Sequence, residues 1–215
     1  MYLPAHFRED RLEVLHDFIR RQGFATLVTL GADGLIANHI PLVIHPEPAP
    51  FGTLRGHVSK ANPQWRDSLP DVPALAIFQG PSAYITPSWY PTTYETGRSV
   101  PTYNYVVVHA HGPMEAYTDP ARLEQHLRTL TDHHEAAFPI PWKIENAPAD
   151  YFQALLKSIV GIEIQIHRLE GKWKVNQNRT AAERAGAVAG LRAAGCPVMA
   201  DLISERSKII TESKE

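Results

Sequence analysis

The sequence contains one cysteine, Cys196, among 215 residues. A single cysteine excludes an internal disulfide and a metal site of the Cys-x-x-Cys type, and it agrees with a reducing compartment. Residues 1–6 lack a cationic segment followed by an apolar stretch, so we expect no secretory signal peptide. These absences predict a cytoplasmic protein.

Long hydrophobic runs and an excess of one charge are also absent. No apolar run approaches the roughly 18 residues that span a bilayer, so we expect no membrane association. The formal net charge is −2, which provides no general attraction to nucleic acid or to an anionic membrane. The contents of hydrophobic residues (44%) and charged residues (20%) are ordinary for a soluble globular protein. We find no repeat or linker, and we expect one domain over residues 1–215.

Hydrophobic periodicity predicts helices on both sides of a strand-rich middle. The apolar spacing of residues 9–22 indicates a helix, and the turn Gly31-Ala32-Asp33-Gly34 indicates a hairpin. Asp119 before Pro120 is typical of a helix N-terminus. The pair Thr180 and Glu183 forms a capping box. Strands are expected at 24–30, 35–45, 53–58, 73–79, 102–117, 162–167 and 172–176, with a short extension of the fourth at 83–89. Further helices are expected from 120, over 149–158, from 180 to about 195 and from 197.

This pattern defines the fold class. About six antiparallel strands with peripheral helices predict a mainly β protein, a small barrel or sandwich. The residues from about 180 are expected to form a helical C-terminal extension of that single domain.

Four short motifs combine polar and aromatic residues, and each follows a strand-like run. Such positions allow a rigid scaffold to present side chains to a ligand. The motifs offer hydroxyls, amides, cations and flat rings, but no nucleophile with its base, so they favour a bound anionic, planar cofactor over bond-breaking chemistry. They are His57–Trp65 (HVSKANPQW), Tyr84–Tyr90 (YITPSWY), Val100–Tyr105 (VPTYNY) and Gly171–Arg179 (GKWKVNQNR).

These motifs, with VPTYNYVVVHAHG, IVGIEIQIHRLEGKWKVNQNR and the N-terminal Met-Tyr-x-Pro-x-His-Phe, closely resemble the PaiB family of negative transcriptional regulators. The resemblance covers about residues 1–180. It implies an FMN-binding split β-barrel related to the pyridoxamine-phosphate oxidases. It also implies a homodimer with FMN at the subunit interface.

The first group of candidate FMN-binding residues follows the third strand. Ser59 and Lys60, with Asn62 just beyond, offer a hydroxyl, an ammonium and backbone N–H groups that suit a phosphate. The segment resembles the Ser-Arg-Lys phosphate-binding segment of the wider split-barrel group. In this chain, His57 replaces part of that pattern. The alternative is a simple turn into a helix, with Lys60 solvated.

Asn38 and His39, in the second strand, form the next candidate group. In related barrels the flavin lies over this strand, so the resemblance implies that one of the two contacts the ring or the ribityl chain. Asn38 could instead cap a bulge, and His39 could be a half-buried packing residue.

Trp173, Gln177 and Arg179 form the third candidate group, because related oxidases carry a tryptophan and a downstream arginine near flavin and substrate. Arg179 could bind a phosphate or carboxylate with two hydrogen bonds. Its structural alternative is an i,i+4 pair with Glu183. The apolar, tyrosine-rich strand around Tyr103, Tyr105 and Val107 is the expected dimer interface.

A different class of function would use a metal. His109 and His111 alternate onto one side of a strand, and Glu115 could complete a facial triad like that of a cupin metal oxygenase. However, Gly112-Pro113 should break the strand before Glu115, and the second cupin motif is missing. We therefore expect no metal.

Two functions remain open. An FMN-binding regulator follows from the resemblance, with DNA or a regulatory protein as its partner. Cations and anions balance from Thr180 to Glu215, whereas a DNA-reading element normally presents a basic face. The alternative is an FMN-dependent oxidoreductase of the pyridoxamine-phosphate-oxidase-like group. In that case the redox chemistry would belong to the flavin.

Overall fold

The computed structural model describes residues 1–212, and the chain forms two compact units. Unit 1 contains residues 1–11, 79–108 and the chain from 170 onward. Unit 2 contains residues 12–78 and 109–169. Three strands, β5, β6 and β9, have residues in both units. No helix among the described residues is long and apolar enough to cross a membrane.

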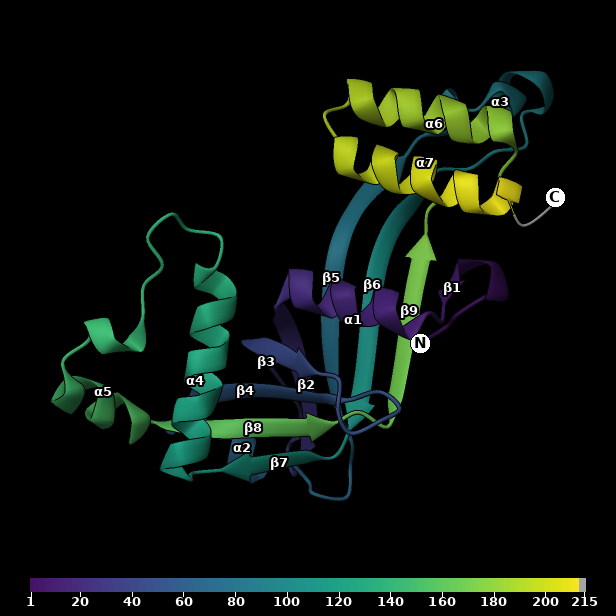
Figure 1. Ribbon diagram of the computed structural model, residues 1–215. Helices are drawn as coiled ribbons and strands as arrows, with labels where there is room; N and C mark the ends of the chain where they lie inside the picture. Colours follow the sequence, from purple (N-terminus) through teal and green to yellow (C-terminus); the bar gives the residue numbers. More distant parts are fainter. Residues whose placement is uncertain (213–215) are drawn as a thin grey trace. The chain divides into compact units, whose positions relative to one another are not determined.

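Unit 2 is an antiparallel sheet with helices (Figure 1). The order of its strands is β5-β2-β3-β4-β8-β7. The elements are α1 (Leu12–Gln22), β2 (Phe24–Gly31), β3 (Gly34–His45), β4 (Thr53–Ser59), α2 (Gln64–Asp67), the start of β5 (Ala74–Ile85), the end of β6 (Thr102–Gly112), β7 (Met114–Tyr117), α4 (Pro120–Glu135), η3 (Ile144–Asn146), α5 (Ala149–Leu156) and β8 (Ile159–Gln165).

Unit 1 combines strands in the order β1-β9-β6-β5 with the two C-terminal helices, α6 and α7, which lie side by side in Figure 1. Its elements are η1 (Ala5–Phe7), β1 (Arg8–Glu9), the end of β5, η2 (Pro87–Trp89), α3 (Pro91–Thr96), the start of β6, β9 (Arg168–Lys174), α6 (Ala181–Ala193) and α7 (Pro197–Glu212).

Local sequence signals account for most of these boundaries. The hairpin of β2 and β3 turns where Gly31 pairs with Gly34. The Asp119 side chain accepts the backbone N–H of Arg122 at the start of α4. Thr180 and Glu183 form the capping box of α6. The prediction of a mainly β protein with peripheral helices is confirmed.

One strand prediction was wrong in detail. The expected strand 102–117 is two strands, because β6 ends at Gly112 and β7 begins after Pro113, which has no N–H for a sheet ladder. The strand expected at 73–79 and its extension at 83–89 form one continuous strand, β5, which runs past Pro81 and ends at Ile85. The short helix α3 was not expected, and α2 was expected only in the alternative interpretation of the Ser59–Asn62 segment as a turn into a helix.

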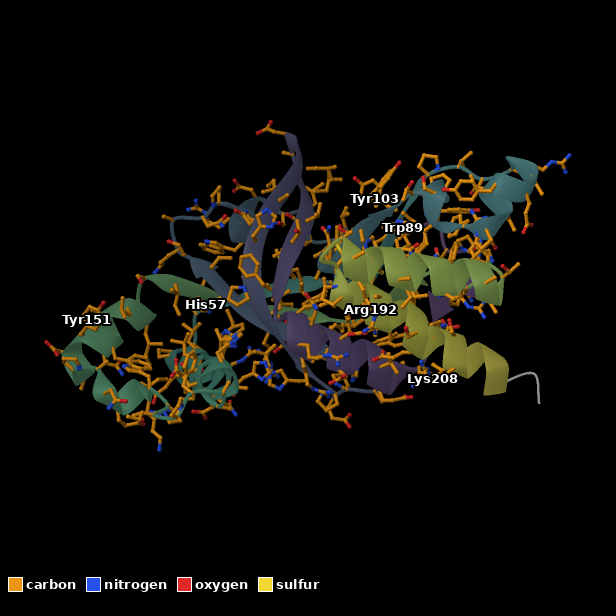
Figure 2. The ribbon with its side chains drawn as sticks, turned by 90° about the horizontal axis from the view of Figure 1, so that it is seen from above. His57, Trp89, Tyr103, Tyr151, Arg192 and Lys208 are labelled. Carbon is orange, nitrogen blue, oxygen red and sulfur yellow. The ribbon has the colours of Figure 1, made fainter. Side chains whose placement is uncertain are left out.

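The sheet of unit 2 has one apolar and one polar face along β4. Leu54 and Val58 are buried on the first face, and they alternate with Arg55 and His57 on the second. Helix α4 covers the polar face, since His57, labelled in Figure 2, lies with its Nδ1 3.2 Å from Nε2 of His126 on α4. A small apolar cluster of Tyr117, Leu123 and Leu156, with Leu127, Phe152 and Ile159 against it, anchors the helix.

In unit 1, the contact between Trp89 and α6 depends on two glycines. A Cβ at Gly190 would lie 2.3 Å from ring atoms of Trp89, and one at Gly186 would lie 2.0 Å from its carbonyl oxygen. Helix α7 is held to β1 because the Arg206 guanidinium donates to buried Glu9 at 2.8 Å. The C-terminal helices are thus packed parts of unit 1.

Candidate functional site

The turn after β4, residues 59–64, is fixed by its own short-range hydrogen bonds. We call it the β4 turn. Ser59 Oγ accepts the N–H of Ala61 at 3.3 Å, and Asn62 Oδ1 accepts the N–H of Gln64 at 3.0 Å. The Ser59 hydroxyl proton remains available to a ligand, because the oxygen acts here as an acceptor.

Lys60 projects from this turn with a fixed backbone and an available ammonium group. Its N–H donates to Ser158 O at 2.8 Å, and its carbonyl accepts the indole N–H of Trp65 at 3.2 Å. The side chain is exposed, and within residues 1–212 it has no hydrogen bond or ion pair. An unpaired ammonium beside a hydroxyl is a suitable receptor for a phosphate.

Asn38 is joined to the β4 turn through a residue that the sequence analysis did not identify. Asn38 Nδ2 donates to Gln64 Oε1 at 2.9 Å. The Gln64 side chain is 1% exposed and donates to Leu27 O at 3.1 Å and Thr29 Oγ1 at 3.2 Å. Strands β2 and β3 and the turn are therefore held in one arrangement. The polar Gln64 inside the Pro-Gln-Trp segment was the signal that could have identified it.

His39 lies on the opposite face of β3 from Asn38, since successive residues alternate along a strand. It is exposed, its Nδ1 lies 3.0 Å from Thr26 Oγ1, and its ring lies 6.3 Å from that of Phe24. The structure therefore brings Asn38, and not His39, into contact with the β4 turn.

His57 lies under α4. Its Nδ1 is 3.2 Å from His126 Nε2, and burial lowers the pKa of His57. His126 is 3% exposed, and burial with the nearby His57, His45 and Arg55 lowers its pKa to about 4. These shifts favour the neutral form of both imidazoles at pH 7. His126 was not identified from the sequence, because it lies on the same face of α4 as the apolar residues and carries no separate signal.

A pocket of about 270 Å³ opens beside the β4 turn. Trp65, which binds the Lys60 carbonyl, forms one wall, and Leu69, Val72 and Met114 form apolar walls. Thr29 and Arg66 add polar groups, and Arg66 lies over the Trp65 ring at 5.3 Å. Apolar and aromatic walls with a few polar groups are typical of small-molecule sites.

In unit 1, Trp173 and Gln177 have roles in the local structure. Trp173 is 8% exposed. The Gln177 amide donates to the Trp173 carbonyl and accepts the N–H of Val175 at 2.8 Å, which fixes the turn after β9. The turn includes Asn176, which has a φ of 63° and whose Oδ1 accepts the Tyr90 hydroxyl at 3.4 Å.

Arg179 is also held within unit 1. Its guanidinium lies 4.8 Å from the centre of the Tyr90 ring and 3.5 Å from Glu183 Oε1, so the i,i+4 pair is present. Lys174 donates to Thr102 and to the Tyr103 carbonyl, the latter at 2.7 Å. Burial and the charges of Lys172 and Arg179 lower the pKa of Lys174. The basic groups of Lys174 and Arg179 therefore have their partners within unit 1.

The metal triad suggested by the sequence is not formed. Glu115 is exposed and faces Glu163 in the pairing of β7 with β8. Across residues 1–212 it belongs to no group of three potential ligands. Arg168 Nη2 lies 3.1 Å from each ring nitrogen of His111, and a cation there opposes metal binding.

Comparison with known proteins identifies the family. Residues 1–168 match the family model described as "Putative FMN-binding domain", and the chain belongs to this family. The family description gives FMN as its cofactor.

Two relatives are similar over nearly the whole chain. An uncharacterised protein of Aspergillus fumigatus is 32% identical over 96% of this chain and 97% of its own. The "Protease synthase and sporulation protein PAI 2" of Bacillus subtilis is 29% identical over 97% of this chain and 99% of its own. The expected resemblance to PaiB is confirmed.

Solved structures support the fold. The flavocytochrome Anf3 of Azotobacter vinelandii has a TM-score of 0.58 at 12% identity, over 78% of this chain and 69% of its own. An FAD and heme binding protein of Mycobacterium smegmatis has a TM-score of 0.54 at 17% identity, over 78% and 73%. The protein therefore has the flavin-binding split-barrel fold, in which the sheet is not closed.

The residues of the β4 turn fit FMN. The hydroxyl of Ser59 and the unpaired ammonium of Lys60 suit the phosphate, and the Trp65 pocket offers apolar walls. Asn38 holds the turn in place through its hydrogen bond to the Gln64 side chain.

Proposed function

We propose that this protein is an FMN-binding regulator of the PaiB type, which acts as a cytoplasmic homodimer. The observation that carries the proposal is the fixed β4 turn, with its unpaired Lys60, in a chain similar over its full length to the Bacillus subtilis protein. That relative is named for protease synthesis and sporulation. No nucleophile with its base stands at the turn.

In this proposal the β4 turn holds the cofactor. Ser59 and Lys60 bind the FMN phosphate, with Asn62 and the Asn38–Gln64 hydrogen bond fixing their positions. FMN would supply redox chemistry when bound. As a ligand of the folded state alone, it would also stabilise that state by mass action. Trp173, Gln177 and Arg179 are weaker candidates for FMN binding, because their polar groups already form hydrogen bonds or ion pairs within unit 1.

The dimer is proposed to form at exposed tyrosines of unit 1, one of which, Tyr103, is labelled in Figure 2. Tyr103 is 58% exposed and Tyr84 50%, and their ring centroids lie 5.7 Å apart. Val107, expected on the same flank, is only 8% exposed and adds little to it. Aromatic residues are enriched in protein interfaces, where they bury large areas.

Direct reading of DNA by α6 and α7 has little support. Arg192 pairs with Asp201 at 2.7 Å, and Arg206 pairs with Glu9 at 2.8 Å. These pairs reduce the free positive charge that phosphate contacts require. We therefore propose that regulation acts through a protein partner.

The dimer is tested with Tyr103→Asp, using light scattering at micromolar protein. The wild type should have twice the mass of the chain, and Tyr103→Asp should shift toward the monomer. Tyr94→Asp is the control, since Tyr94 is 78% exposed and lies outside the Tyr84–Tyr103 pair. A monomeric wild type would remove the dimer from the proposal.

The regulatory role is tested by anaerobic reduction of FMN-loaded protein with a panel of electron donors, beside DNA-shift and partner-capture assays at physiological salt. We expect slow, unspecific reduction, no direct DNA shift, and capture of a partner that depends on FMN. Rapid, donor-specific reduction with neither DNA nor partner binding would instead identify a flavin-dependent oxidoreductase.

A further inference from the structure

A second polar site lies between α4 and the polar face of the unit 2 sheet. It is a pocket of about 80 Å³, which we call the α4 pocket. Its sheet wall is formed by His45 of β3, Arg55 of β4 and Tyr117 of β7, and its helix wall by Arg122, Gln125 and His126. The volume suits a small polyatomic ion and is far below that of a flavin.

Two imidazoles of this pocket have unused buried nitrogens. Nδ1 of His126 and Nε2 of His45 are both buried, and within residues 1–212 neither has a hydrogen-bond partner. The other nitrogen of His126 faces His57 at 3.2 Å. Buried polar atoms in folded proteins nearly always have a partner, so these nitrogens point to a bound species in the pocket.

The charge of the pocket indicates which species that is. The guanidinium groups of Arg55 and Arg122 share one carboxylate oxygen, Oε2 of Glu163, at 2.7 and 3.1 Å. Among the residues that line the pocket none is acidic. Glu163 and its neighbour Glu115 on β7 lie outside the lining. The lining itself therefore carries two guanidinium groups and no carboxylate, a local positive charge that water would hydrate but would not neutralise.

The helix wall holds Arg122 in position to meet an anion. Its guanidinium lies 4.1 Å from the centre of the Tyr117 ring, and one nitrogen, Nη2, donates to Glu163. A guanidinium has five N–H donors, so others remain for a ligand. Oxygen anions are preferred partners of arginine because two parallel hydrogen bonds can form.

We propose that the α4 pocket binds one compact oxyanion, phosphate or a carboxylate group, through Arg122, Arg55 and the imidazoles of His45 and His126. The site is additional to the β4 turn. It would link the anion concentration of the cell to the packing of α4 on the sheet, because the anion contacts both walls. This inference does not depend on the regulatory role.

The test measures binding of inorganic phosphate and acetate to FMN-free protein at constant ionic strength, with chloride as reference. Thermal unfolding should show a rise in melting temperature with phosphate for the wild type. Arg122→Gln should weaken phosphate about tenfold or more, the change expected for one charge-assisted hydrogen bond. It leaves the Arg55–Glu163 pair in place.

The control is Arg128→Gln on the same helix. Arg128 pairs with Glu124 and Glu145 and does not line the pocket, so phosphate should bind this variant like the wild type. Spectra of ¹⁵N-histidine protein give a second readout: phosphate should shift the His126 signal. Equal weakening in both variants, or an unchanged His126 signal, would mean that the pocket holds only water.

The phosphate of FMN has the same chemistry, so the titration is repeated on FMN-saturated protein. Phosphate should bind there with unchanged affinity if the pocket is a separate site. Competition between FMN and phosphate that disappears in Arg122→Gln would assign the pocket to the flavin phosphate and overturn the inference of an additional site. The proposal for the β4 turn is judged separately, by Lys60→Ala.

Discussion

Basic side chains have different surroundings in the two units. In unit 1, Lys172 donates to the Tyr2 carbonyl at 2.9 Å, and Arg206 pairs with buried Glu9. In unit 2, the Lys60 ammonium is unpaired and exposed, and Arg55 and Arg122 line the α4 pocket, whose lining contains no carboxylate. The number of carboxylates does not distinguish the units, because Arg11 and Arg206 share Glu9 just as Arg55 and Arg122 share Glu163. Arginines that pair with a buried carboxylate contribute mainly to stability, whereas cations that border a pocket or solvent are available to an anionic ligand.

The largest effect on stability should come from Glu9→Gln in unit 1. Glu9 is 3% exposed and accepts hydrogen bonds from Arg11 and Arg206 at 2.7–2.8 Å. Removing this charge takes the buried carboxylate away from Arg11 and Arg206, and we expect a loss of about 3 kcal/mol in the free energy of unfolding. Urea denaturation at pH 7 measures the loss, with exposed Glu205→Gln as the control.

The contribution of Glu9 to the free energy of unfolding depends on pH. Burial alone would raise the pKa of Glu9, but hydrogen bonds from Arg11 and the charges of Arg11 and Arg206 lower it to about 2. Because the folded pKa is below the ordinary value of 4.5, the contribution is complete above pH 4.5 and is lost as the pH falls toward 2. The stability of Glu9→Gln should therefore fall less between pH 4.5 and 2 than that of the wild type. Equal dependence of stability on pH in the two proteins would contradict the lowered pKa of Glu9.

His126 should produce a second pH dependence, at higher pH. Its folded pKa of about 4 lies below the ordinary 6.5, so the unfolded chain binds the proton more readily. The free energy of unfolding should therefore fall by up to about 3 kcal/mol as the pH drops from 6.5 to 4. His126→Leu should flatten this slope, although His57 and His45, whose pKa values are also lowered, keep part of it.

The control for this slope is His133→Leu, an exposed position on the same helix. It should leave the pH profile as in the wild type. Arg55, Arg122 and Tyr117 also line the pocket, and Glu163 pairs with both arginines; all four are unchanged in both variants. Equal slopes in His126→Leu and the wild type would show that the pH dependence arises elsewhere.

Arg179→Ala should have the smallest effect. It removes the contact with Tyr90 and the partner of Glu183, which still accepts hydrogen bonds from Thr180 and Thr92. We expect a loss of about 1 kcal/mol in stability and an FMN affinity closer to wild type than that of Lys60→Ala. A large drop in FMN affinity with unchanged stability would return Arg179 to the cofactor site.

Local sequence signals predicted many elements of the fold because they act within a few residues. The Gly31–Gly34 turn, the Asp119 cap and the Thr180–Glu183 capping box all form as expected. Pro113 was recognised as a strand breaker beside Glu115, but a single strand was still expected over 102–117. The short helices α2 and α3 have too few turns for periodicity to reveal them.

The candidate site was only partly predictable, because its contacts join distant segments. The motif at Ser59 and Lys60 was identified through resemblance, but its link to Asn38 depends on Gln64. His57 and His126 are 69 positions apart in the sequence, so no local periodicity could predict their contact. In the Lys172–Arg179 segment, composition suggested a ligand site, whereas hydrogen bonds within unit 1 occupy most of its polar groups.

The most direct test of the β4 turn compares FMN with riboflavin, which lacks the phosphate, by quenching of flavin fluorescence. The wild type should bind FMN at micromolar concentration and riboflavin more weakly. Lys60→Ala should lose about tenfold or more in FMN affinity and little in riboflavin affinity, while exposed Lys208→Ala on α7 should match the wild type. If Lys60→Ala bound FMN as tightly as the wild type, the β4 turn would not be the phosphate site.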